Sequence, residues 1–567
     1  MSRMLRHAHD LSHTVSGTVN MGLCYPGTIF ECFPGDSFKI QAQDLTRFMP
    51  QISPTMADVN VGVDFYQVPW RQLFDKIGLD WDAFLTGGEN GSDTSVLPTI
   101  TIPATGYDEG SLADWLNYPC NYVDPQTGNK VVVGAGLELN ALPVIAYMHI
   151  INENYRDQNF IAKLDLTKYQ DFLDGTYVFT DPDGNTISYP MLVNGVFRKA
   201  WSRDYYGRAM SNTQRGNVVS VPLSGTPAPV VYGSAVTTGA GGQTVANMVG
   251  KQAAGYLASS TNVMATATGG SVNVAPLEAD LSGIPAFDLI TLRLAARMQR
   301  FGEILQKSGA RAVEFTYAMF GVRIPDDRIQ RPVFHGSFKL PVIFSEVLQT
   351  GETTSASPQG NLAGHGITGG TNNPLHIKCI EHGYVVAIMH VMPKPQYQNI
   401  VPKYLLRSTR WDIPNPLFQH VGDQPIKRVE IYPNSANPNQ NFGYVPHYTE
   451  LSFVPSTIHG MMKGEMLHWT MARVFSSEPV LSAAFRYAEP SMRSFAVQSM
   501  IIGTSQTVVT APQMQVQVGF IIKGRRLFAN ASPTLPILAL APDGVVAPPF
   551  ADNKGFNPAA RKSATSR

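Results

Sequence analysis

Two segments near opposite ends of the chain alternate apolar and polar residues with a period of two. Residues 59–66 read VNVGVDFY, and residues 513–520 read QMQVQVGF. Because successive side chains of a strand point to opposite faces, this pattern predicts half-buried β-strands with one apolar face each. A third segment, 384–391, is continuously apolar, which predicts a central strand covered on both faces. Strands scattered among long connections favour one large β-sandwich with elaborated loops.

Turn residues support the same class of fold. The chain contains 49 Gly and 41 Pro, as expected for short strands joined by many turns. Segments 122–133 and 177–187 each read as strand, turn and strand, with Asp-Pro opening the turn and Gly-Asn following it. The sequence therefore predicts two β-hairpins here, and no internal repeat is evident.

A few helices are expected between the strands. After Pro285, apolar residues recur with helical spacing and arginines fall between them, which predicts a helix over about 286–308 that stops at Gly309. Shorter helical stretches are expected around 70–75 and 141–155.

Charge and cysteine content narrow the class of protein. Lys+Arg and Asp+Glu both number 43, so the formal net charge is zero. A chain that neutralises nucleic acid by itself is usually strongly basic. If this chain surrounds a genome, most of the neutralising charge must come from another source.

Four cysteines without a CxxC motif predict free thiols made in a reducing cytoplasm. The N-terminus has no apolar stretch after its basic residues, so we expect no signal peptide.

No motif for catalysis or for a resident cofactor is evident. His376, Cys379 and His382 are spaced by two residues, which suits no common zinc pattern and leaves the fourth ligand unidentified. Asp181 and Asp183 imitate the start of a calcium loop, but the Gly and Glu that such a loop needs are missing, so a plain turn is the better explanation. We therefore expect no enzyme activity, no cofactor and no bound metal.

Two segments have unusual composition. Residues 224–276 are rich in Gly, Ala, Thr, Val and Ser, and Lys251 is their only charged residue. They form either a flexible surface loop or an insertion that packs against copies of itself, since a long solvated loop normally carries more charge. Residues 532–567 hold six prolines and a basic end, which predicts an extended arm lying on a neighbouring molecule.

Small basic clusters are candidates for binding phosphate groups. Basic side chains near mobile termini bind nucleic acid without reading its sequence. Ordinary solvated termini would contain the same residues, and this alternative stays open. The candidate nucleic-acid contacts are Arg3, Arg6, Arg525, Arg526, Arg561 and Lys562.

Specific strings, in order along nearly the whole chain, resemble the major capsid proteins of the Microviridae, especially of gokushovirus-like bacteriophages. The closest match is INENYRDQN at 151–159. Departures are Ile324, where the family usually has serine, and Val445-Pro446 after Gly443-Tyr444. Other matching strings are LSHT at 11–14, PGDSF at 34–38, FYQVPWR at 65–71, SLADWL at 111–116, NALP at 140–143, WSRDYY at 201–206, VSVPL at 219–223, FGVRIPDDRIQRP at 320–332, EHG at 381–383, GDQP at 422–425 and FGY at 442–444.

The resemblance implies an all-β fold, the viral jelly roll, with eight antiparallel strands in two sheets and long loop insertions. It also implies a T=1 icosahedral capsid of sixty subunits with pentamer and threefold contacts, assembled in the host cytoplasm around a circular single-stranded DNA genome. Implied partners are a small basic DNA-binding protein, a minor or pilot capsid protein, a scaffolding protein and a bacterial surface receptor. Residues 224–276 correspond to an insertion that forms a threefold protrusion in this family.

These expectations give a domain plan. Residues 1–13 form a basic arm, 14–223 and 277–531 form the two parts of the jelly-roll core, 224–276 form the protrusion, and 532–567 form the C-terminal arm. The first alternative is a secreted β-sandwich that binds glycans, which would need a signal peptide and, typically, a calcium site. An enzyme is the second alternative.

Overall fold

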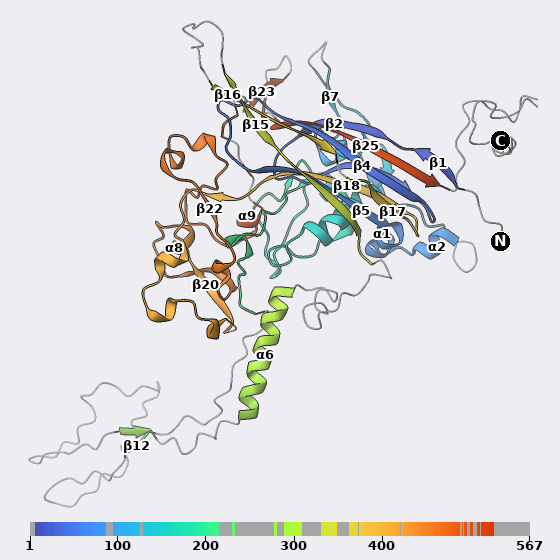
Figure 1. Ribbon diagram of the computed structural model, residues 1–567. Helices are drawn as coiled ribbons and strands as arrows, with labels where there is room; N and C mark the ends of the chain where they lie inside the picture. Colours follow the sequence, from blue (N-terminus) through green and yellow to red (C-terminus); the bar gives the residue numbers. More distant parts are fainter. Residues whose placement is uncertain are drawn as a thin grey trace, which may run out of the picture. The chain divides into compact units, whose positions relative to one another are not determined.

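The fold is that of a computed structural model, which describes residues 6–86, 94–124, 129–214, 230–232, 277–279, 289–308, 330–348, 362–371, 373–419, 421–487, 490, 493–495, 499–502, 507–510 and 512–526. Two antiparallel sheets dominate the described residues. Strands from both ends of the chain lie together in the larger sheet, where the blue β2 and β4 flank the red β25 (Figure 1).

The larger sheet has seven strands in the order β1–β25–β4–β16–β15. Strand β2 also pairs with β25, and β17 also pairs with β4. The strands are β1 (His7–Asp10), β2 (His13–Val19), β4 (Ser37–Phe48), β15 (Ile343–Leu348), β16 (Leu362–Thr371), β17 (Leu375–Lys378) and β25 (Met514–Arg526).

The smaller sheet has four strands in the order β14–β5–β18–β3. These are β14 (Val333–Pro341), β5 (Val59–Pro69), β18 (Gly383–Pro393) and β3 (Tyr25–Cys32). Its inner face meets that of the larger sheet, as in the edge-to-face contact of Phe65 and Phe520, whose ring centroids are 6.4 Å apart.

The path of the chain between the two sheets confirms the predicted jelly roll. Strands β2, β3, β4 and β5 alternate between the sheets, and β14, β16, β18 and β25 complete the winding. This order is that of an eight-stranded jelly roll built from antiparallel strands. Two connections are very long: β5 to β14, and β18 to β25.

The helices lie in these connections. Helix α4 is apolar on all sides, as expected of a helix enclosed by protein, and eight of its nine residues are buried. It continues into a π-helical turn, Ile151–Tyr155, so the helix predicted over 141–155 is confirmed. The helices of the first connection are α1 (Trp70–Ile77), α2 (Trp81–Thr86), α3 (Leu112–Trp115), α4 (Leu142–Ile150) and α5 (Tyr169–Leu173), and those of the second are α8 (Arg428–Ile431) and α9 (Ala483–Arg486).

Short strand pairs complete the connections. They are β6 (Thr99–Thr101) with β9 (Glu138–Asn140), β7 (Tyr122–Val123) with β8 (Lys130–Val131), β10 (Leu192–Val193) with β11 (Val196–Phe197), β19 (Gln396–Tyr397) with β22 (Ser456–Thr457), β20 (Asp423–Lys427) with β21 (Asn441–Pro446), and β23 (Ser499–Ile502) with β24 (Thr507–Thr510).

Two local predictions need correction. Strand β5 is buried on both faces at all but one residue, so the half-buried face predicted from its alternation is wrong. Helices α1 and α4 pack against this strand. Its second face is covered by other parts of the chain. His390 of β18 lies against Gly62, and Tyr155 contacts both Asp64 and Tyr66. In 177–187 the turn is present, but its flanks form only an isolated bridge between Thr180 and Thr186 instead of two strands.

The chain divides into two compact units, Met1–Thr213 with Val322–Arg567, and Gln214–Gly321. The predicted helix over 286–308 is present as α6 (Leu289–Ser308), and it belongs to the second unit, whereas the domain plan assigned it to the core. This unit also contains the pair β12 (Val230–Tyr232) and β13 (Leu277–Ala279). The rest of 224–276 and all of 532–567 lie outside the described residues. No helix in the described residues is long and apolar enough to cross a membrane.

Candidate nucleic-acid interface

The predicted basic residues that the structure describes converge at one end of β25. Strand β1 pairs with this end, placing His7 opposite Arg526 and Ala8 opposite Arg525. Arg6 directly precedes β1 and is exposed. The structure thus brings together Arg6, Arg525 and Arg526, while Arg3, Arg561 and Lys562 lie outside the described residues.

Arg526 is an internal cation, which differs from its predicted role as a phosphate contact. Its Nε atom lies 3.1 Å from Oδ2 of Asp36, whose side chain is fully buried. Its guanidinium group also lies over the rings of Phe33 and Phe38 and donates to the carbonyl of Glu31. The alternation of β25 turns this side chain inward, so it stabilises the end of the sandwich.

Arg525 points outward and has neighbours that the sequence did not reveal. Outward-facing positions of β25, β4 and β17 lie side by side because their ladders are in register. Lys39 of β4 is opposite both Lys523 of β25 and His376 of β17. In the adjacent row, Ser37 lies between Arg525 and Lys378. We call the five exposed basic residues of these rows the basic face: Lys39, His376, Lys378, Lys523 and Arg525.

The basic face is electrostatically unusual. Like charges directly opposite each other on neighbouring strands destabilise a sheet, yet Lys39 and Lys523 are such a pair. Among the described residues, one carboxylate compensates: Asp10 forms an ion pair with Lys523, which lowers the pKa of Asp10 to about 2. Lys39, Lys378 and Arg525 form no ion pair within the described part of the chain. The face therefore suits a polyanion.

The three residues of the doubtful metal motif have separate surroundings. His376 is exposed on the basic face, Cys379 is buried, and the ring of His382 stacks on Trp70 with centroids 6.1 Å apart. In the described residues, no group of three or more His, Cys, Asp or Glu side chains could hold a metal ion.

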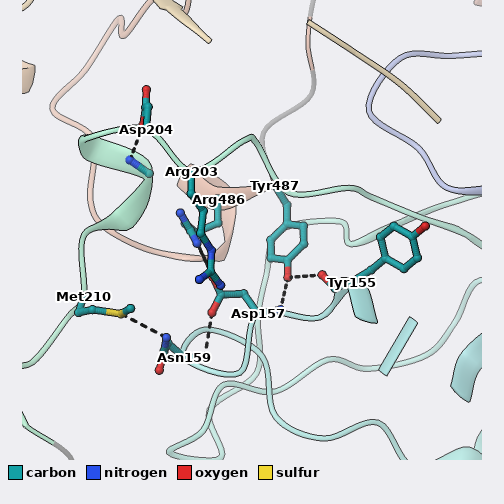
Figure 2. Close-up of polar contacts among 9 residues, drawn as sticks. Tyr155, Asp157, Asn159, Arg203, Asp204, Met210, Arg486 and Tyr487 are labelled. Carbon is teal, nitrogen blue, oxygen red and sulfur yellow. Dashed lines mark hydrogen bonds and ion pairs between the residues drawn. The ribbon is translucent and has the colours of Figure 1, made fainter. Parts of the chain in front are cut away.

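Residues of the string INENYRDQN take part in most of the polar contacts shown in Figure 2. The carboxylate of Asp157 accepts hydrogen bonds from Nε and Nη2 of Arg486 at 3.0 and 2.6 Å. The hydroxyl of Tyr487 accepts from the Asp157 backbone N–H at 2.5 Å and donates to the Tyr155 carbonyl at 3.2 Å. Burial alone would raise the pKa of Asp157, but the charge and hydrogen bonds of Arg486 outweigh it and hold this pKa below its usual value.

This buried ion pair has a structural role, because it joins the two long connections of the jelly roll. Asp157 belongs to the β5–β14 connection and Arg486 to the β18–β25 connection. Both side chains are only 4% exposed, so they offer no binding site.

Comparison with known proteins now assigns the family. The family model described as capsid protein (F protein) matches residues 1–526. The chain belongs to this capsid protein family. The capsid protein is 31% identical over 493 residues to capsid protein VP1 of Bdellovibrio phage phiMH2K, covering 81% of this chain and 84% of that protein. It is also similar to capsid protein VP1 of Chlamydia phage 1 (27% over 547 residues, 85% and 89% covered) and of Spiroplasma virus 4 (28% over 531 residues, 85% and 90% covered).

These findings confirm the resemblance stated from the sequence strings. The capsid protein is a structural component of a virion, related to the capsid proteins of the Microviridae. They give no support to the glycan-binding alternative or to an enzyme.

Proposed function

We propose that this capsid protein assembles with copies of itself into a T=1 icosahedral shell around a circular single-stranded DNA genome. Assembly takes place in the cytoplasm of the bacterial host and uses pentamer and threefold contacts. The jelly roll supports this proposal because its different sides offer different surfaces, so one side of a subunit can contact another side of the next. Contacts between two different surfaces are heterologous, and they close into rings when the rotation between subunits allows.

The basic face meets the DNA backbone in this proposal. The strand registers that gather five exposed basic side chains on this face are the observation that carries it, because among them only Lys523 has a carboxylate partner, Asp10, within the described residues. Neighbouring like charges of this kind are stabilised when an anion lies over them. The other outward residues of the same strands include Gln41, Gln515 and Gln517. The acidic side chain beside this face, Asp10, is paired with Lys523. Contacts from basic and polar side chains to phosphate groups do not read bases.

Other partners belong to the same proposal. The capsid protein has zero formal net charge, so a small basic DNA-binding protein supplies most of the neutralising charge. A minor or pilot capsid protein and a scaffolding protein take part in assembly. Residues 224–276 form an outer protrusion that contacts a surface receptor of the host, and residues 532–567 form an arm on a neighbouring subunit.

Electron microscopy and sedimentation of the purified protein, with and without circular single-stranded DNA, test the proposal. Closed, uniform particles that form or gain stability with the DNA are the expected result. Particles that form equally well with and without DNA, and exclude it, would overturn the genome-binding part. A protein that stays monomeric at high concentration, with DNA and with lysate of phage-infected host cells, would overturn the shell itself.

A further inference from the structure

The connection between β18 and β25 folds into a lobe with its own small core. We call residues 394–487 the insertion lobe, drawn mainly in orange in Figure 1. A hydrophobic cluster separate from the main core lies here, and it combines lobe residues with three residues of the β5–β14 connection. Its buried members are Tyr205, Tyr206, Ala209, Tyr397, Ile426, Ile431, Phe442, Val445 and Phe485.

One part of the insertion lobe is ordered without burying any of its side chains. Three successive 3-10 turns, Lys403–Leu406, Arg410–Asp412 and Pro416–Phe418, contain no buried residue. Local hydrogen bonds hold them: Asp412 accepts from the Thr409 N–H at 2.8 Å, and Asn415 accepts from the Leu417 N–H at 3.0 Å. These turns contribute nothing to the core of their own subunit.

The same turns expose large apolar side chains. Trp411 is 66% exposed, Ile413 62% and Leu417 86%. A second segment adds Leu451 at 61% and Val454 at 93%. Exposed apolar side chains of this size are common singly, but a group of them on one stretch of surface marks an interaction site.

Hydrogen bonds and an ion pair connect the two segments. The Asn415 N–H donates to the Tyr448 hydroxyl at 2.9 Å, and Arg407 lies 3.4 Å from Glu450. The apolar side chains therefore lie on adjoining segments. We call the following residues the lobe patch: Trp411, Ile413, Leu417, Val421, Leu451 and Val454.

The area of the lobe patch is comparable to that of the largest apolar patch on a typical monomer. Six side chains of this kind offer on the order of 500 Å² of apolar surface. The largest apolar patch of a typical monomer measures about 300–600 Å² and is often functional, and a standard interface covers about 800 Å² of each partner. The lobe patch could thus supply the apolar centre of a subunit contact.

The charges around the lobe patch indicate which kind of molecule covers it. Arg407 is paired with Glu450, and Arg428 with Glu478 at 2.9 Å. Asp412 accepts hydrogen bonds from its own turn, which lower its pKa to about 2. Arg410, whose guanidinium group lies 4.7 Å from the centroid of the Trp411 ring, is an exposed cation without an ion pair in the described residues. One such cation within an apolar patch is too few to attract a polyanion. The surface is complementary to another electrically neutral protein, and a second copy of this chain has zero formal net charge.

We propose that the lobe patch is a contact surface between copies of this capsid protein, covered by a neighbouring subunit in the particle. The inference rests on the proposed self-assembly and specifies where one of its contacts lies. Association through a modest apolar surface is sufficient in a closed shell, because many such contacts act together.

Hydroxyl-radical footprinting with mass spectrometry, on intact particles and on dissociated subunits, tests this directly. Trp411 and Leu417 should be labelled at least fivefold less in particles than in subunits. Equal labelling in both states would overturn the proposal. A patch that faced a host receptor instead of a neighbouring subunit would give this result. Particle formation is read separately by microscopy, so a failure of shell assembly is distinguishable from an uncovered patch.

A matched pair of variants adds a second test. Leu417→Asp with Val454→Asp should leave the melting temperature of the subunit unchanged, because neither residue packs in the monomer, but should abolish particles. The control is Val96→Asp with Val178→Asp, two valines that are 77% and 63% exposed outside the insertion lobe. Wild-type assembly by the lobe variant, or equal loss of particles in the control, would contradict the proposal.

Discussion

Asp157 and Arg486 form a buried ion pair with Nη2 and Oδ2 2.6 Å apart, although 329 residues separate them in the chain. Each side chain comes from a different long connection of the jelly roll. The pair therefore holds together two segments that the two main sheets alone do not join.

Asp157→Asn should reduce the free energy of unfolding by about 3–5 kcal/mol, because it leaves the charge of Arg486 buried without a partner. Urea unfolding at pH 7 measures this change. The pKa of Asp157 in the folded protein lies below its ordinary value of 3.8. The stabilisation is therefore complete above about pH 4 and is lost as the pH falls through the folded pKa, where wild type and variant should converge.

Lys130→Gln is the matched control, since it breaks an ion pair with Asp108 whose side chains are 51% and 66% exposed. An exposed pair contributes about 0–1 kcal/mol. If Asp157→Asn costs no more than this control, the buried pair does not stabilise the fold as argued.

Asp44 should make the protein less stable as the pH rises. Its side chain points into the sandwich from β4, and burial raises its pKa to about 6 despite a hydrogen bond from Thr46. A raised carboxyl pKa gives a contribution that is complete below the ordinary value of 3.8 and lost as the pH rises through about 6. Asp44→Asn should therefore be more stable than wild type at pH 8, by up to about 3 kcal/mol.

Thermal unfolding of both proteins between pH 4 and pH 8 tests this prediction. The difference in stability between the two proteins should grow between about pH 4 and pH 6 and stay constant above that range. A constant difference at every pH would show that Asp44 does not titrate in this range.

Gly383→Ala should destabilise the protein by roughly 1–3 kcal/mol. A Cβ atom at this position of β18 would meet the backbone of β5, with Cα of Pro69 only 3.0 Å away and the Val68 carbonyl oxygen closer still. Backbone atoms in a central strand cannot move aside. Chemical denaturation measures the cost.

Gly519→Ala serves as the comparison, because no atom would lie within 3.9 Å of its Cβ. Both glycines are in strands, so the change in chain entropy is similar. Equal effects of the two substitutions would argue against the close approach of β18 and β5.

Lys39→Gln with Arg525→Gln should weaken binding to single-stranded DNA at low salt. The slope of log affinity against log salt should fall by about 0.7 for each phosphate group that the variant no longer neutralises. Fluorescence anisotropy with a labelled oligonucleotide at several salt concentrations measures both quantities.

Lys163→Gln, which changes a lysine of the β5–β14 connection outside the basic face, is the control. An unchanged slope in the double variant would exclude the basic face as a DNA contact.

Local patterns in the sequence predicted the jelly-roll strands well where burial follows the alternation, as in β25, and where a strand is continuously apolar, as in β18. They failed for the second face of β5, because Gly62 lies against His390 of β18 and Asp64 contacts Tyr155, two residues that are distant in the sequence. The buried role of Asp64, which accepts a hydrogen bond from Tyr155 at 2.6 Å, depends on this tertiary cover.

The candidate site was only partly predictable for a related reason. Arg525 was identified from a local cluster, but Lys39 and Lys378 become its neighbours only through the registers of β4 with β25 and β17. Spacing along the sequence contains no information on such registers. Arg526 belongs to the same cluster as Arg525, and strand alternation alone would have separated the inward side chain from the outward one.

The position of β25 has a consequence for synthesis on the ribosome. This strand spans Met514–Arg526, yet its partners β1, β2 and β4 are translated first. Until β25 emerges from the ribosome, the edges of β2 and β4 that pair with it have unpaired backbone N–H and C=O groups. A prematurely terminated chain would lack the central strand of its larger sheet, so a defective translation product cannot complete the fold. The topology thus acts as a check on length, because only polypeptides translated past Arg526 can complete the larger sheet.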